Sequence, residues 1–457
     1  MIAGCSLPAN CKGRAAVFDL CGGVYLNVRL SHRLHAVPVR CGDALMPLIR
    51  PFSGLRPRAE FAAQVLAPPY DVVTVDEARA RAAGRPWSFL HISRPEIDLP
   101  PGTDPYAPEV YRKGRENFER QIAAGVLGRD PGPCYYLYRL VMGSHTQTGL
   151  VAAASVAAYE SQRIRRHEHT RPDKEDDRVR QIEALDAQTG PVFLTYRRSA
   201  GIDRIVANLT SHPPEVDVTA DDGVRHSLWV VREPSAIEAL SIGFEAVDCL
   251  YVADGHHRSA AAARVAAARH GRGAPDAERT CDYFLSVIFP DNQMQILPYN
   301  RVVRDLNGLT PEDFVERVAV DFEVQRAASA VTPARTGEFG MYLSGQWYRI
   351  SIHAECIPRH DAVRRLDVSL LADHLLAPVL GIQDPRRDRR IDFVGGIRGL
   401  DELQRRVDSG EMAVAFSMFP TALADLMAVA DAGEVMPPKS TWFEPKLADG
   451  LVSQMLD

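Results

Sequence analysis

Apolar and polar positions along the chain form short runs and longer periodic stretches, separated by Gly, Pro and Asp turn signals. Short apolar runs predict strands, and stretches with apolar residues three and four positions apart predict helices. Strands are expected to begin near residues 135, 149, 192, 228, 250, 283 and 295, with a hairpin over 340–352. Helices are expected over 75–83, 106–124, 174–187, 202–209, 237–246 and 366–380, and one is expected to begin at 310. This mixture predicts an α/β to α+β fold, a mixed β-sheet with surrounding helices.

The stretch at 249–264, CLYVADGHHRSAAAAR, organises this pattern. The run 250–253 predicts a buried strand, Asp254-Gly255 a tight turn, and the Ala-rich run 259–268 a helix. In a strand–turn–helix unit, the turn N–H groups and the positive end of the helix dipole converge on one spot. That spot favours an anion.

Three side chains that can contact a phosphate, His256, His257 and Arg258, follow this turn. An Arg fork matches phosphate oxygens, and a His donates a hydrogen bond and can move a proton. The simpler interpretation is a structural connection with solvated polar residues. We favour the phosphate site, because folding does not require two adjacent His and an Arg here.

A second group of polar side chains lies in the segment 161–170, SQRIRRHEHT. If residues 165–169 are extended, His167 and His169 share one face and Glu168 points to the other. The segment could be a solvated charged connector. An H-x-H pair could also bind zinc, but no third ligand stands at a recognisable spacing. A catalytic or phosphate-facing role is the favoured hypothesis.

Two proline-rich loops are further candidates for the lining of a site. Pro68 and Pro69 fix an extended loop before Tyr70 and Asp71. Near the C-terminus, prolines force an irregular path through Lys439, Ser440 and Thr441. The alternative for this second loop is a terminal arm that packs through Trp442 and Phe443.

Composition narrows the possible functions. The chain has 457 residues, 46 % hydrophobic and 25 % charged, which is typical of globular proteins with two or three domains. The net charge of −6 argues against nucleic-acid binding, and no apolar stretch is long enough for a membrane helix. The eight Cys form no C-x-x-C pair, which indicates no zinc knuckle and a cytoplasmic location. The oligomeric state is left open.

Composition also suggests domain boundaries. Residues 1–45 hold four of the eight Cys and differ from the rest, so we expect a disordered extension and a natural start at Met46. Beyond it we expect an N-terminal α/β domain over 46–235 and a nucleotide-binding segment over 236–304. An α+β region over 305–457 is expected to close the site.

Several motifs in order resemble the domain of unknown function 1015 family. They are RPFSGLRP at 50–57, LAPPYDVV at 66–73, IRRHEHT at 164–170, YVADGHHR at 251–258, LDVSLL at 366–371 and MPPKSTWFEPKL at 436–447. The resemblance runs from about Met46 to the C-terminus.

The DGHHR segment is also similar to the phosphate-binding turn of the ParB/sulfiredoxin superfamily, which includes free-serine kinases. The resemblance implies that the strand–turn–helix unit has this fold and binds nucleotide phosphates. His256, His257 and Arg258 would then face phosphates, and Gly255 would let the backbone approach. Sulfiredoxin has a Cys in this turn where this chain has His256, which argues against sulfiredoxin chemistry.

Together these features lead us to expect a phosphotransferase that converts free serine to phosphoserine, or the reverse, with ATP or ADP and Mg²⁺. Its partners would be the nucleotide and a small phosphorylated or hydroxyl ligand. Glu168 is the expected base, with His167, His169 and His257 as acid–base or phosphate contacts. The residues expected to bind the nucleotide phosphates are Asp254, Gly255, His256, His257, Arg258, Lys439, Ser440 and Thr441. Those expected to bind the substrate are Tyr70, Asp71 and Arg165. The expected Mg²⁺ ligands are Asp254 and Glu168.

Two alternatives remain open at this point. A nucleotide-responsive, ParB-like binding protein would need a basic recognition helix, and the strongest basic clusters are 386–390 and 364–365. A hydrolase of another phosphoester would use nearly the same residues.

Overall fold

A computed structural model describes residues 46–270 and 279–456 of the chain. The expected extension 1–45 lies outside the described residues. Among the described helices, none has the length and apolar character needed to cross a bilayer.

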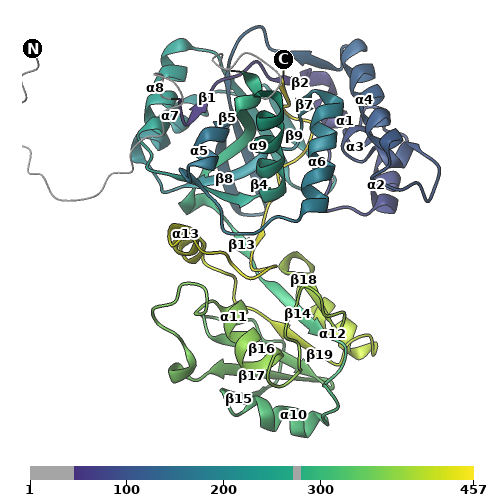
Figure 1. Cartoon of the computed structure of the whole chain (residues 1–457), viewed down its shortest axis with the longest axis vertical. Helices are drawn as coiled ribbons and strands as arrows, with labels where there is room; N and C mark the ends of the chain where they lie inside the picture. The colour runs from purple at the N-terminus through teal and green to yellow at the C-terminus, as the bar shows by residue number, and fades with distance from the viewer. Residues whose placement is uncertain (1–45, 271–278, 457) are drawn as a thin grey trace, which may run out of the picture. The chain divides into compact units, whose positions relative to one another are not determined.

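A nine-stranded mixed sheet forms the larger core (Figure 1). Its order is β6-β11-β8-β12-β5-β4-β10-β9, and β1 pairs with β5. β6 is parallel to β11, β8 is parallel to β12, and the other pairs are antiparallel. The strands are β1 (Ile49–Arg50), β4 (Tyr135–Met142), β5 (His145–Ser155), β6 (Ile164–Arg165), β8 (Val192–Tyr196), β9 (Val216–Thr219), β10 (Arg225–Val231), β11 (Leu250–Asp254) and β12 (Tyr283–Pro290).

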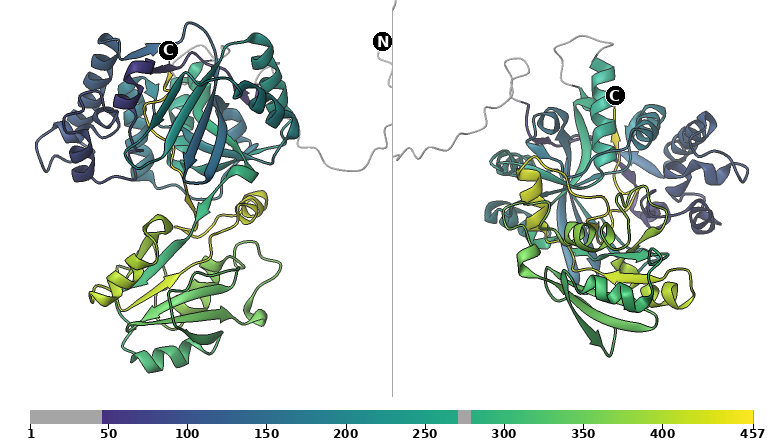
Figure 2. Two further views of the ribbon diagram at one scale, coloured as in Figure 1. Left: turned by 180° about the vertical axis from the view of Figure 1, so that it is seen from behind. Right: turned by 60° about the horizontal axis from the view of Figure 1, so that its bottom comes forward.

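Side chains that alternate along these strands bury both faces of the sheet. On β12, Phe284 and Ile288 pack in one cluster with Phe244 and Ala262 from helices. Leu285, Val287 and Phe289 pack in another, with Phe443 and Leu447 from the C-terminal segment. Seen from behind, in Figure 2, the strands face the viewer. The helices are α1 (Ala62–Val65), α2 (Val75–Ala82), α3 (Leu90–Ser93), α4 (Pro108–Ala123), α5 (Val156–Glu160), α6 (Pro172–Leu185), α7 (Ala200–Leu209), α8 (Pro234–Glu245) and α9 (His256–His270).

A second, six-stranded sheet is antiparallel throughout, in the order β15-β17-β16-β19-β14-β18. Its strands are β14 (Tyr299–Val303), β15 (Phe322–Ala327), β16 (Glu338–Leu343), β17 (Gln346–Ile352), β18 (Ile391–Gly395) and β19 (Val414–Ser417). Its helices are α10 (Pro311–Val318), α11 (Asp367–Leu371), α12 (Asp401–Asp408) and α13 (Leu423–Asp431). Short pairs join β2 (Leu55–Pro57) to β3 (Leu127–Arg129), β7 (Ala187–Gln188) to β21 (Gln454–Met455), and β13 (Ile296–Leu297) to β20 (Trp442–Phe443).

The predicted α/β architecture with a mixed sheet is confirmed. The predicted start of the helix at residue 310 and the predicted hairpin over 340–352 are also found in the structure. Thr310 caps α10 through a bond from the Asp313 N–H, and Pro311 is the first helical residue. The β16–β17 hairpin turns at Ser344-Gly345, where both φ angles are positive (50° and 79°).

Three predicted element bounds were wrong. The strand expected over 149–159 begins at His145 and ends at Ser155, whose hydroxyl caps α5. The strand expected over 295–301 is two strands, because Pro298 between them has no N–H to donate. The helix expected over 366–380 stops being regular at Leu371 and continues as a π-helical turn, Ala372–Leu376.

Asp367, at the start of α11, predicts a pH dependence of stability. Its carboxylate is 8 % exposed and accepts a bond from the Gly337 N–H, and burial raises its pKa to about 7. An unfolded Asp ionises near pH 3.9, so holding the proton makes the folded state lose stability as pH rises from about 4 to 7. Asp367→Asn removes this loss. The unfolding free energy of Asp367→Asn relative to wild type is expected to be higher at pH 8 than at pH 4, by on the order of 2–4 kcal/mol.

Denaturant unfolding at pH 4, 6 and 8 measures this gain. The control is Glu316→Gln on the exposed face of α10, which should shift stability little at any of these pH values. Equal stability changes for Asp367→Asn at pH 4 and pH 8 would contradict the prediction.

Candidate functional site

The connection between β11 and α9 forms the floor of the candidate site. β11 ends at Asp254, Gly255 follows with φ of +95°, and α9 begins at His256. The helix therefore begins three residues earlier than the expected start at Ser259. His256, His257 and Arg258 lie in its first turn. The Arg258 N–H already donates to the Gly255 carbonyl at 2.9 Å, so the N–H groups of His256 and His257 are the ones left for a ligand among the described residues.

A cavity of about 240 Å³ opens at this helix start. Segments far apart in the sequence line it: the Pro-Pro loop, the segment after β6, the β11–α9 connection, and the C-terminal arm. From the sequence-predicted set, it contains Tyr70, Asp71, Glu168, Asp254, Gly255, His256, His257, Arg258, Lys439, Ser440 and Thr441. His167, His169 and Arg165 do not line it.

The carboxylate of Asp254 is held by cations. Lys446 Nζ lies 3.2 Å from its Oδ2, and Arg258 Nη2 lies 3.8 Å away. Burial alone would raise the pKa of Asp254, but these two charges hold it well below its ordinary value. Its Oδ1 accepts from the Gly255 N–H at 2.8 Å, which fixes the turn. Asp254 is thus ionised and oriented at the edge of the cavity.

The Arg258 guanidinium lines the cavity but is buried and already bonded within the protein. Its side chain is 10 % exposed, and its Nη1 donates to the Pro191 carbonyl. Gly255 allows this packing, since a Cβ at that position would lie 2.9 Å from Arg258 Nε. The guanidinium contributes positive charge to the cavity from behind the turn.

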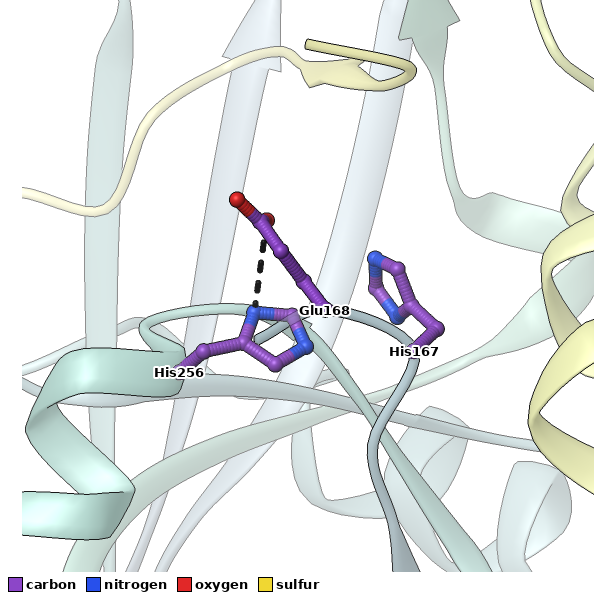
Figure 3. A group of neighbouring side chains, drawn as sticks. All are labelled: His167, Glu168 and His256. Atoms are coloured by element: carbon purple, nitrogen blue, oxygen red, sulfur yellow. Dashed lines mark ion pairs between the residues drawn. The ribbon is translucent and has the colours of Figure 1, made fainter. Parts of the chain in front are cut away.

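Glu168 lies beside two buried histidines (Figure 3). Its Oε2 is 3.9 Å from His256 Nδ1, beyond hydrogen-bond distance, and the rings of His256 and His167 meet edge to face at 4.5 Å. Burial, together with the charge of Asp254, raises the pKa of Glu168. Burial lowers the pKa of His167 to about 4 and that of His256 well below its ordinary value. Both rings are neutral at neutral pH.

The condition that residues 165–169 are extended does not hold. β6 ends at Arg165 and the chain bends at Glu168, so His167 is 2 % exposed while His169 is exposed. The two histidines therefore do not share a face. His169 lines an adjoining cavity of about 990 Å³ instead.

Three other candidates are engaged in local contacts. His257 Nε2 accepts from the Arg171 N–H at 3.1 Å, and burial lowers its pKa. Arg165 pairs with Tyr251 on β11 and donates to Asp431 at the end of α13, so it is engaged away from the Asp254 turn. Ser440 donates to the Pro437 carbonyl at 2.6 Å.

Lys439 is the most available cation at the cavity. It is exposed, and within the described residues no carboxylate forms an ion pair with it. Its Nζ lies 5.5 Å from the centroid of the Tyr299 ring, and its charge lowers the pKa of Glu168 against the larger effect of burial. Lys439 lines both the 240 Å³ and the 990 Å³ cavities. It can therefore reach a phosphate at the boundary between them.

Tyr70 and Asp71 also line both cavities, as do Glu168 and His257. The Arg178 guanidinium stacks over the Tyr70 ring at 3.8 Å, and burial raises the pKa of Tyr70 to about 12. The larger cavity also holds Arg94, Arg171, Lys174, Arg386 and Arg387. Four of these five basic side chains already pair with carboxylates: Arg94 with Glu96, Arg171 with Asp173, and Arg386 and Arg387 with Asp384. A negatively charged ligand that extends from the smaller cavity would therefore have to compete with these ion pairs.

The candidate set omitted three polar residues of this region. Lys446 forms an ion pair with Asp254, and the Arg178 guanidinium stacks over the Tyr70 ring. Asp449 is 2 % exposed and lies near Arg258, and burial raises the pKa of its carboxyl group to about 7. Lys446 and its neighbours stand in the motif at 436–447, which was a usable signal for Lys446. Arg178 and Asp449 had no sequence signal.

Glu168 and Asp254 fit the Mg²⁺ requirement in part. The two carboxylates line one cavity and interact electrostatically, since Asp254 raises the pKa of Glu168. A Mg²⁺ ion takes one or two protein carboxylates together with phosphate oxygens. Lys446 already neutralises Asp254, and a Mg²⁺ ion bound directly to Glu168 would stop that carboxylate from acting as a base. The two expected roles of Glu168, Mg²⁺ ligand and base, therefore exclude each other.

Gly255→Ala should lower stability by about 1–2 kcal/mol, because its φ of +95° strains any Cβ and the methyl group would meet Arg258. The matched control is Gly223→Ala, at φ of +83°, where a Cβ meets nothing within 4 Å. Thermal unfolding should show a loss for both variants and a larger one for Gly255→Ala. Equal losses would show that the contact with Arg258 is unimportant.

The sequence profile of the family described as "Protein of unknown function (DUF1015)" matches residues 49–369. No curated protein matches the chain. Among solved structures, a free serine kinase in complex with AMP is 14 % identical, covering 66 % of this chain and 92 % of its own, with a TM-score of 0.32.

Two other solved structures are similarly distant. A conserved hypothetical protein from Pyrococcus furiosus is 15 % identical over 65 % of this chain and 94 % of its own, with a TM-score of 0.31. SbnI with a C-terminal truncation, from Staphylococcus aureus, is 12 % identical over 65 % of this chain and 84 % of its own, with a TM-score of 0.34. At these scores, no residue role is transferred from them.

Proposed function

The chain belongs to the DUF1015 family, and we propose that it is a nucleotide-binding phosphotransferase acting on a small hydroxyl substrate. The proposed reaction transfers a phosphoryl group between ATP or ADP, with Mg²⁺, and free serine, or runs in reverse. The observation that carries the proposal is the 240 Å³ cavity at the start of α9, where a carboxylate of raised pKa meets cations and hydroxyls.

Phosphoryl transfer requires charge neutralisation, alignment and a group that takes the proton of the attacking hydroxyl. The N–H groups of His256 and His257 at the start of α9, together with Lys439, would hold the nucleotide phosphates. Lys446 and Arg258 would keep Asp254 ionised and add positive charge. Mg²⁺, when bound to the nucleotide, would neutralise phosphate oxygens beside Asp254 and leave the Glu168 carboxylate free to act as a base.

Glu168 is the residue proposed to accept the hydroxyl proton. A general base works best when its pKa approaches the operating pH, and burial and Asp254 move the pKa of Glu168 in that direction. The adjoining 990 Å³ cavity, with Tyr70 and Asp71 on its border, would hold the part of the ligand that does not react.

Turnover tests the proposal directly. The full chain is incubated with serine, Mg²⁺ and ATP or ADP, and phosphoserine is measured by ³¹P NMR; phosphoserine with AMP or ADP tests the reverse direction. We expect phosphoserine formation that requires both nucleotide and serine. Release of inorganic phosphate without phosphoserine would favour a hydrolase, and nucleotide binding without either product would favour a binding protein.

A further inference from the structure

Three side chains with metal-binding atoms converge beside the proposed phosphate site. His167 and Glu168 follow β6, and His256 begins α9. β6 and β11 pair in parallel, with Arg165 opposite Tyr251, so both segments leave the same end of the sheet. One ligand atom from each side chain lies within 4.8 Å of the others. Figure 3 shows the three side chains as neighbours, with the Glu168 carboxylate on the side of the His256 ring.

The two histidines are buried without the partners that buried imidazoles ordinarily have. His167 is 2 % exposed and His256 is 4 % exposed. Among the described residues, both nitrogens of His167 and Nε2 of His256 make no hydrogen bond of normal geometry, although the Val252 backbone lies near enough to His167 to act on its pKa. Glu168 Oε2, at 3.9 Å from His256 Nδ1, does not satisfy the remaining nitrogen. Packing alone leaves this cluster of lone pairs unused.

We propose that His167, Glu168 and His256 bind one divalent transition-metal ion of the Zn²⁺ class. Two imidazole nitrogens and one carboxylate oxygen are a set that binds Zn²⁺ with a fourth position open. Mg²⁺ prefers oxygen ligands and would not select two imidazoles. With bonds of about 2.0–2.2 Å, two ligand atoms are at most about 4.4 Å apart, so rotation of the partly exposed Glu168 side chain closes the site.

The open position faces the 240 Å³ cavity, because Glu168 and His256 line it. Metal binding itself does not depend on the proposed phosphotransferase activity, but its consequence rests on that function. A carboxylate that coordinates a metal cannot accept the hydroxyl proton. Zn²⁺ is therefore expected to inhibit phosphoryl transfer at the concentration at which it fills this site.

Cobalt(II) titration of the chelator-treated full chain tests the site by visible spectroscopy, and Zn²⁺ calorimetry supplies the affinity. We expect one Co²⁺ per chain with the intense bands of four- or five-coordinate cobalt. Affinity should fall by at least about tenfold in His167→Gln, Glu168→Gln and His256→Gln. The matched control is His169→Gln in the same segment, which is exposed and outside the cluster, and should bind as wild type does.

Wild-type chain that shows only the spectrum of aqueous Co²⁺, or binding that is equal in all four variants, would overturn the proposal. If the buried histidine variants fail to fold, Glu168→Gln decides, because its side chain is 43 % exposed. Metal binding without any turnover would refute the phosphotransferase and leave the metal site standing. Turnover without cobalt binding would refute the metal site and leave the phosphotransferase standing.

Discussion

Glu168→Gln will lower the rate of phosphoryl transfer by about 10²–10⁴-fold while leaving nucleotide affinity within about threefold of wild type. The amide keeps the shape of the side chain but cannot take a proton. Among the described residues, Glu168 makes no salt bridge closer than 3.9 Å, so the change should not disturb the fold. The matched control is Glu183→Gln, an exposed position on α6, which should retain full activity.

The pH dependence gives this prediction a second readout. Glu168 must be ionised to act as a base, and its pKa is raised above the ordinary value near 4.3. The rate of the wild-type protein should therefore fall as pH decreases through that raised pKa. In the pH–rate profile of Glu168→Gln, this fall at low pH should be absent. A variant that keeps both the rate and the fall at low pH would show that another group takes the proton.

Lys439→Met will weaken nucleotide binding by roughly 10- to 100-fold, corresponding to about 1.4–2.8 kcal/mol for a charge-assisted phosphate contact. Lys439 is exposed at the border of both cavities, and in the described structure no acidic side chain pairs with it. The loss should be smaller at high salt, where the charge is screened.

Fluorescence titration with a labelled ADP measures the Lys439 effect. The control is Lys113→Met on α4, whose ammonium pairs with Glu116 at 3.4 Å and lies outside both cavities. Equal affinities for Lys439→Met and Lys113→Met would remove Lys439 from the phosphate set.

The local part of the site could be predicted from sequence because it is encoded within a few residues. An apolar run, Asp254-Gly255 and an Ala-rich stretch specify strand, turn and helix by propensity alone. Only the helix start was misplaced, because His256 to Arg258 have weaker helix propensity than the alanines that follow.

The rest of the site depends on contacts between distant segments. Lys446 reaches Asp254 across 192 positions, and His256 meets Glu168 only because β6 and β11 pair in parallel. The bend at Glu168 separated His167 from His169 and gave His167 a different histidine partner. The expected substrate contact Arg165 instead pairs with Asp431, which sequence periodicity could not indicate.

The domain limits at 235 and 304 stay a prediction, although the nine-stranded sheet takes strands from both sides of residue 235. The roles assigned to Tyr70 and Asp71 likewise rest on their placement beside the cavity.

A crystal structure of the full chain with ADP and Mg²⁺ is the most direct test of the central claim. The account predicts the β-phosphate in the 240 Å³ cavity, within hydrogen-bond distance of first-turn N–H groups of α9 and of Lys439 Nζ. A nucleotide whose phosphates lie away from Asp254 to Arg258, or a chain that stays empty at saturating ADP, would contradict it.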